Sequence, residues 1–118
     1  MRWGELPGDD RDLLFLVLWF MVGYYSDFDL DKLLKVLLTL DSGLMGDPGW
    51  EFEYIADDAG TEFYSFSADC SFSGIEPSLR NYSVEVVRDA IKESLLALVY
   101  KQPSKADHVA DLIIKYRL

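Results

Sequence analysis

Few residues in this 118-residue sequence have the types and spacing that catalysis requires. The single cysteine, Cys70, and the single histidine, His108, would form a nucleophile–base dyad only if the fold brought them together, and no flanking signature supports that pairing. The glycine patterns of nucleotide-binding loops and the serine motif of hydrolases do not occur. The carboxylates are too numerous for one pair to be singled out for acid–base work. The sequence therefore predicts a protein that is not an enzyme and uses no cofactor.

Aspartates at alternate positions give one segment the opening of a calcium-binding loop. Asp27, Asp29 and Asp31 have this spacing, but Lys32 stands where the loop needs glycine and Leu38 where it needs glutamate. Capping of a following helix explains these aspartates more simply. Zinc ligands are too few, because the chain has one cysteine and one histidine. We therefore expect no metal site, and a divalent-cation or small-ligand binder ranks third among three hypotheses.

Acidic side chains outnumber basic ones by 21 to 11, which gives a formal net charge of −10. No lysine, arginine or histidine occurs from residue 36 to residue 79, a stretch that holds nine acidic residues. Nucleic-acid binding is not expected, because neutralising phosphates requires clustered lysine and arginine. Two carboxylates 4 Å apart repel by about 1 kcal/mol in water, and no interspersed lysine relieves this cost. The stretch is therefore either a solvated acidic segment or a surface that meets a cationic partner.

The centre of the acidic stretch has the pattern of a β-hairpin. Aromatic and acidic side chains alternate over residues 50–54, which is typical of a half-buried strand. Residues 57–60 favour a turn in which Gly60 adopts a positive φ, and residues 61–67 form the return strand. Residues 68–74 extend that strand or add a third.

The two faces of this hairpin differ in chemistry. The aromatic side chains of the first strand share its inner face, and Glu51 and Glu53 share the other. Phe63 and Tyr64 are adjacent, so they point to opposite faces and one of them is exposed. We expect a partner to contact the hairpin carboxylates, with one tyrosine as an anchor inside the charged rim: Glu51, Glu53, Asp57, Asp58, Glu62 and Tyr64.

Helices are predicted on both sides of the hairpin. The spacing of apolar residues predicts them over about residues 10–25, 30–41, 84–101 and 104–117. Ser83 is the expected cap of the third helix, and the segment from Ser104 to Asp107 resembles a capping box for the fourth. The fold class is therefore α+β: about four helices packed around the central apolar first helix, with an antiparallel hairpin or small sheet in the middle. Residues 1–118 are expected to form a single globular domain.

The apolar run from Leu13 to Tyr25 is not expected to enter a membrane. As a helix it is roughly 20 Å long, whereas the hydrocarbon core is roughly 30 Å thick. Its upstream flank is acidic, which is the opposite of a signal peptide. With a single cysteine, this indicates a cytoplasmic protein.

The acidic, aromatic span from Trp50 to Phe72 beside a leucine-rich helical core resembles the immunity proteins of bacterial toxin systems, including those of contact-dependent growth inhibition. The resemblance implies a cytoplasmic protein that binds and neutralises one cationic toxin, in the first place a nuclease. Carboxylates would occupy the positions of nucleic-acid phosphates in the basic cleft of such an enzyme, and electrostatic steering would speed association.

A non-catalytic oligomeric assembly or accessory protein is the alternative. The first helix places large side chains on several faces, more than a few short helices cover: Trp19, Phe20, Tyr24 and Tyr25. In this hypothesis a second copy of the chain completes their burial, and the chain is a homo-oligomer.

Overall fold

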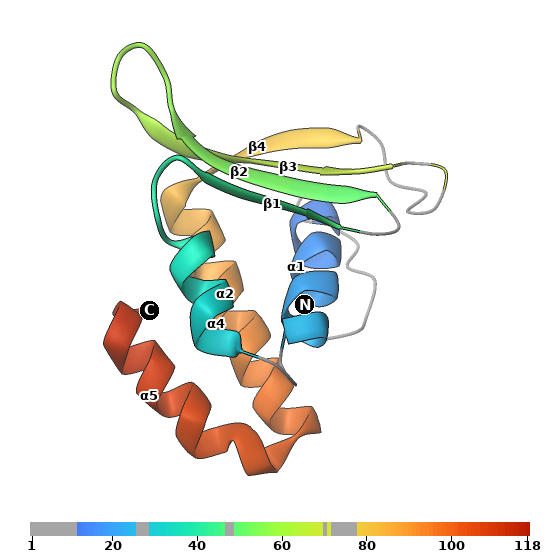
Figure 1. Ribbon diagram of the computed structural model, residues 1–118, viewed down its shortest axis with the longest axis vertical. Helices are drawn as coiled ribbons and strands as arrows, with labels where there is room; N and C mark the ends of the chain where they lie inside the picture. The colour runs from blue at the N-terminus through green and yellow to red at the C-terminus, as the bar shows by residue number, and fades with distance from the viewer. Residues whose placement is uncertain (1–11, 26–28, 47–48, 70, 72–77) are drawn as a thin grey trace.

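A four-stranded antiparallel sheet lies on a layer of helices (Figure 1). The computed structural model describes residues 12–25, 29–46, 49–69, 71 and 78–118. All the described helices lie on one face of the sheet. The α+β class predicted from the sequence is confirmed, but the helices form a layer beneath the sheet rather than a bundle around the first helix.

Each strand pairs with the next along the chain, so the sheet is a meander of β1 (Ser42–Gly46), β2 (Trp50–Ala56), β3 (Glu62–Ala68) and β4 (Leu79–Ser83). The predicted hairpin is β2–β3, and its register places Phe52 opposite Phe66. The strand expected within residues 68–74 is not seen in the described residues, since β3 ends at Ala68 and much of that segment lies outside them. β1 and β4 flank the hairpin and were not expected as strands.

The inner face of the sheet is aromatic and supplies much of the core. Alternate residues of β2 and β3 turn toward the helices and are buried: Trp50, Phe52, Tyr54, Tyr64, Phe66 and Ala68. The Tyr54 and Tyr64 rings stack with their centroids 4.3 Å apart, and the Phe52 and Phe66 rings with theirs 5.9 Å apart. The inner face expected for the first strand is confirmed.

The helical layer contains α1 (Asp12–Tyr25), α2 (Leu30–Leu37), α4 (Val84–Lys101) and α5 (Ala106–Tyr116), with the short 3₁₀-helix η1 (Pro103–Lys105) before α5. α1 packs against α2, α4 and the sheet, and α5 packs against α4. Six apolar side chains of α1 are buried there: Leu13, Leu14, Leu16, Val17, Leu18 and Met21. None of the helices in the described part of the chain is long and apolar enough to cross a membrane.

Two helix ends differ from the sequence prediction. α2 ends at Leu37 rather than at about residue 41. Asp41 adopts a φ of 64° and donates its N–H to the Tyr54 carbonyl at 2.7 Å, just before β1 begins at Ser42. α5 begins at Ala106 without a side-chain cap, so the capping box expected from Ser104 is wrong. Ser83 does cap α4, and its Oγ accepts the Val86 N–H at 3.3 Å.

Candidate functional site

The face of the sheet that points away from the helices is called the outer face here. Its central part is a shallow hollow of about 270 Å³ that is lined by residues of β2, β3 and β4: Glu51, Glu53, Ile55, Phe63, Ser65, Ser67, Leu79 and Asn81. Ile55 and Phe63 lie directly opposite each other in the β2–β3 register and form a partly exposed apolar pair at the end of the hollow nearest the hairpin turn. Along β2 the pair lies between Glu53 and the turn aspartates, and the next outer-face residue on β3 is Ser65.

Glu51 and Glu53 lie side by side on the outer face, because alternate residues of β2 point the same way. Partial burial raises the pKa of the Glu51 carboxyl, and a hydrogen bond and charge repulsion from Glu53 raise it further. No described lysine or arginine forms an ion pair with either side chain. The two carboxylates therefore repel each other on an open surface, where a cation from outside would relieve the repulsion.

The two turn aspartates have different roles. The Asp57 carboxylate accepts hydrogen bonds from the Ala59 and Thr61 N–H groups, each at 2.9 Å, and so holds the turn together. Gly60 has a φ of 82°, as the sequence predicts. Asp58 is exposed at the tip of the hairpin.

Two of the six predicted contact residues do not lie on the outer face. Glu62 shares the other face with Tyr54 and accepts a hydrogen bond from the Tyr54 hydroxyl at 2.8 Å. Tyr64 has no exposed surface, and its hydroxyl donates to the Leu37 carbonyl. Its predicted role as a surface anchor is wrong in this structure, because the side chain is part of the core. Phe63 is the neighbour that faces outward.

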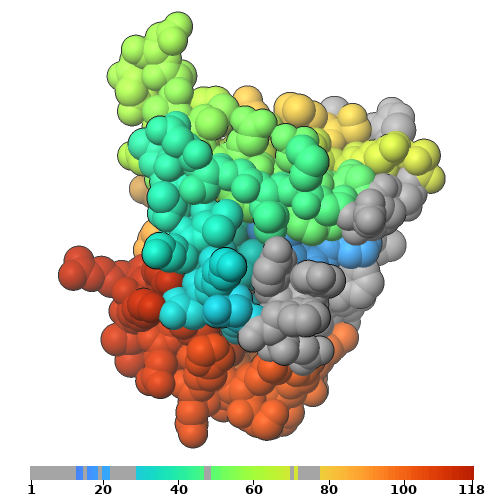
Figure 2. All heavy atoms as spheres, viewed as in Figure 1, coloured from blue at the N-terminus to red at the C-terminus, as the bar shows by residue number. Residues whose placement is uncertain are grey.

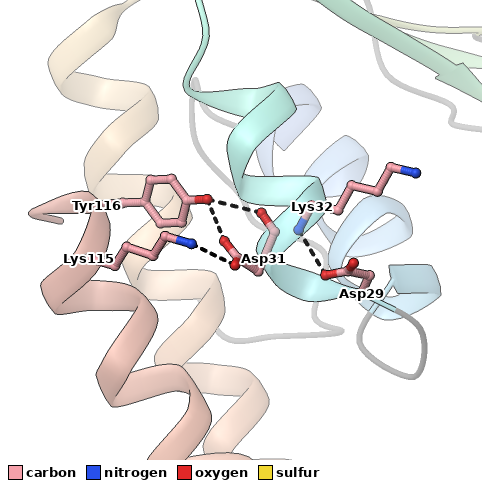
Figure 3. A network of polar contacts seen from close by, with 5 residues as sticks. All are labelled: Asp29, Asp31, Lys32, Lys115 and Tyr116. Carbon is pink, nitrogen blue, oxygen red and sulfur yellow. Dashed lines mark hydrogen bonds and ion pairs between the residues drawn. The ribbon is translucent and has the colours of Figure 1, made fainter.

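Two cations of the terminal helices, Arg88 and Lys115, bind groups of the helices themselves. The Lys115 Nζ lies 2.7 Å from the Asp31 Oδ2, and the Tyr116 hydroxyl also donates to Asp31 (Figure 3). The Arg88 Nη2 donates to the Tyr116 carbonyl at 2.6 Å and to the Arg117 carbonyl at 3.2 Å, at the C-terminal end of α5. These groups attach α5 to α2 and α4.

The other candidate residues from the sequence lie apart from this surface. Asp29 caps α2, and its Oδ1 accepts the Lys32 N–H at 3.0 Å (Figure 3). His108 is exposed on α5, whereas Asp27 and Cys70 lie outside the described residues. Among the residues that the structure describes, no three side chains of the metal-binding types are grouped around one point.

Comparisons of the chain with models of known families, with curated proteins and with solved structures gave no match. Function is therefore inferred from the chemistry of the outer face and the hairpin tip.

Proposed function

We propose that this protein is an immunity or inhibitor protein that binds a cationic toxin, a nuclease in the first place, through the outer face of the β2–β3 hairpin and its tip. The contacts are Glu51 and Glu53 on the face and Asp57 and Asp58 at the tip, with Phe63 between them as the apolar anchor. Glu62 lies at the same end of the hairpin but belongs to the other face.

One observation supports this proposal above the others. Glu51 and Glu53 are adjacent on an open face, and no described basic side chain pairs with them. The repulsion raises the free energy of the unbound folded protein. A cation that binds between the two carboxylates removes the repulsion, and this adds to the free energy of binding. A nuclease cleft is lined by basic residues that bind phosphates. Two carboxylates two residues apart on a strand present negative charges to these basic residues, as the phosphates do.

A partly exposed apolar pair among the carboxylates suits a protein partner better than a free ion. Interfaces gain most of their affinity from a few buried apolar or aromatic anchors inside a polar rim, and Phe63 beside Ile55 has this arrangement. The charges then control the rate of association, and the anchor controls the rate of dissociation.

Exposed apolar residues on the helices support the alternative, a homo-oligomeric assembly or accessory protein. Leu96 and Tyr100 are one turn apart on α4, and their side chains are 52% and 87% exposed. Phe20, part of the original support for this hypothesis, packs against the core. For Trp19, Tyr24 and Tyr25 the structure describes the helix backbone but not the side chains. Light scattering separates the two functions: the assembly predicts a stable oligomer without any partner, and the inhibitor predicts a monomer.

The test compares two variants that each lose four negative charges. The first neutralises the proposed contacts, E51Q, E53Q, D57N and D58N, and the matched control neutralises exposed acids of α4 and α5, E85Q, D89N, D107N and D111N. Each chain is immobilised and exposed to lysate of the host at low ionic strength, and captured proteins are identified by mass spectrometry. We expect the wild type and the control to retain the same basic nuclease, which the free wild-type chain then inhibits. If the first variant captures this nuclease as well as the wild type does, the proposal is contradicted.

A further inference from the structure

β1 is an open edge of the sheet. It pairs with β2 on one side, and no described strand pairs with its other side. β1 runs along the near edge of the sheet in Figure 1, and its atoms face the viewer in Figure 2. A free edge exposes a row of main-chain N–H and C=O groups that can pair with an added strand.

The direction of these groups follows from the register. A Cβ built on Gly43 would lie 2.9 Å from the Phe52 carbonyl oxygen, so this oxygen points toward β1, where Leu44 is the residue opposite Phe52. Hydrogen-bonded and non-bonded pairs alternate along an antiparallel ladder. Gly43 and Met45 therefore direct their N–H and C=O groups away from β2, which offers two donors and two acceptors to a further strand.

β1 also lacks the features that usually protect an edge. It has no charged side chain and no proline, and two of its five residues are glycines. β4, at the other edge, carries Arg80 and runs directly into α4. Of the two edges, β1 is therefore the one suited to strand addition.

The surface beside β1 identifies the occupant. A hollow of about 520 Å³ runs along β1 and is lined on its β2 side by Glu51 and Glu53, and Asp41 also lines it. Gly43 lies opposite Glu53 and has no side chain. A long side chain on a strand added to β1 can therefore pass over Gly43 and reach the Glu53 carboxylate. Neighbouring strands are about 4.8 Å apart, which leaves two strand spacings for a lysine and a glutamate to span together.

We infer that an extended basic segment of the partner binds β1 as an added strand, with alternate lysine or arginine side chains over Gly43 and Met45 that reach Glu53 and Glu51. This inference rests on the proposed function and specifies its binding mode. A second copy of the chain fits this edge less well, because each copy has a net charge of −10 and brings carboxylates rather than cations.

The probe is a nine-residue peptide of alternating lysine and threonine with blocked ends, and the control peptide has glutamate in place of lysine. Amide hydrogen exchange of the ¹⁵N-labelled full chain is measured by NMR with each peptide. We expect the lysine peptide to slow exchange at Gly43 and Met45 at least about tenfold, because exchange then requires the added strand to open. The glutamate peptide is expected to have no effect.

Two proline variants separate the two edges. M45P removes a donor that points away from β2, so β1–β2 pairing stays intact and peptide binding is lost. N81P is the matched control at the β4 edge. The Ala68 N–H donates to the Ser78 carbonyl at 2.9 Å, and the same alternation turns the Asn81 N–H outward. N81P is expected to bind the peptide as the wild type does.

The outcomes distinguish the binding mode from the proposed function. If the lysine peptide changes the NMR chemical shifts of Glu51 and Glu53 but does not slow exchange at Gly43 and Met45, the strand addition is wrong. The acidic surface then still binds the cationic peptide, as the proposed function requires. Protection at Asn81 instead, no binding of the lysine peptide, or β1 amides protected by a dimer before any peptide is added also overturns the strand addition. The exchange measurement on the wild type stands even if M45P does not fold.

Discussion

The Tyr64 hydroxyl on β3 donates a hydrogen bond to the main-chain carbonyl of Leu37, the last residue of α2. This bond joins the sheet to the end of a helix 27 positions earlier in the chain. It satisfies a carbonyl that a helix end leaves without an intrahelical partner. It also explains why Tyr64 is a core residue, although it stands among the carboxylates in the sequence.

Loss of that bond is expected to destabilise the fold. Y64F keeps the stacked ring but leaves the Leu37 carbonyl buried without a partner, so the free energy of unfolding should fall by about 1–3 kcal/mol. Chemical denaturation followed by circular dichroism measures this change. Binding of a cationic partner should be unaffected once the variant is folded. An unchanged midpoint would show that the bond does not stabilise the native state.

Phe63 and Phe66, which lie on opposite faces of β3, should respond differently to truncation. Phe66 is fully buried, so F66A should lower the free energy of unfolding by about 3–5 kcal/mol. Phe63 is partly exposed on the outer face, so F63A should cost only about 1 kcal/mol. F63A should nevertheless weaken partner binding at least about tenfold, because it removes the apolar anchor. Full binding by a folded F63A protein would exclude Phe63 as the anchor.

The ionised Glu51 carboxylate is expected to lower the stability of the folded protein at neutral pH. Its pKa in the folded protein is raised, chiefly by burial and then by Glu53, so the folded state binds a proton more tightly than the unfolded state. Its ionisation therefore lowers stability as the pH rises from the unfolded glutamate pKa of about 4.3 through the raised value. E51Q should melt at a higher temperature than wild type at pH 7, and the difference should vanish near pH 4. A lower melting temperature for E51Q at pH 7 would contradict this account.

The attachment of α5 to α2 should weaken in acid. The hydrogen bond from Lys115, followed by that from Tyr116, lowers the pKa of Asp31, so the folded state favours its ionised form. The stabilisation is complete above the unfolded aspartate pKa of about 3.9 and is lost as the pH falls below it toward the folded value.

Exchange in α5 measures this attachment directly. Amides of α5 in D31N should exchange faster than those of the wild type at pH 7, while amides of β2 and β3 keep their wild-type rates. The pH dependence of melting between about 2 and 5 should be flatter in the variant than in wild type. Equal α5 exchange in both proteins would mean that the Lys115–Asp31 pair does not hold the helix.

Local patterns were sufficient to predict some elements and not others. The alternation over residues 50–54 predicted β2, and the Ser83 cap with its apolar stripe predicted α4. β1 was missed because Ser42–Gly46 contains two glycines and no alternation of its own, so its strand conformation depends on pairing with β2. β4 has no alternating pattern of its own either, so its strand conformation depends on pairing with β3.

The candidate site was also predicted only in part, because local patterns indicate which residues share a strand face but not how the strands pair. Alternation along a strand separated Phe63 from Tyr64 and set Glu51 beside Glu53, since both follow from chain geometry. Which member of the first pair faces the helices depends on the β2–β3 register, in which Tyr64 stacks on Tyr54. The free edge at β1 depends on a strand that had no signal in the sequence, so no local pattern indicated it.

The central claim is that Glu51 and Glu53 meet a cationic protein, and titration calorimetry against the captured basic partner at a series of NaCl concentrations tests it most directly. We expect the affinity of the wild type to fall steeply as salt rises, and E51Q/E53Q to bind more weakly at low salt with a shallower dependence. E85Q/D89N, which loses the same charge on α4, should retain the wild-type slope. Identical affinities and slopes for the wild type and E51Q/E53Q would contradict the claim.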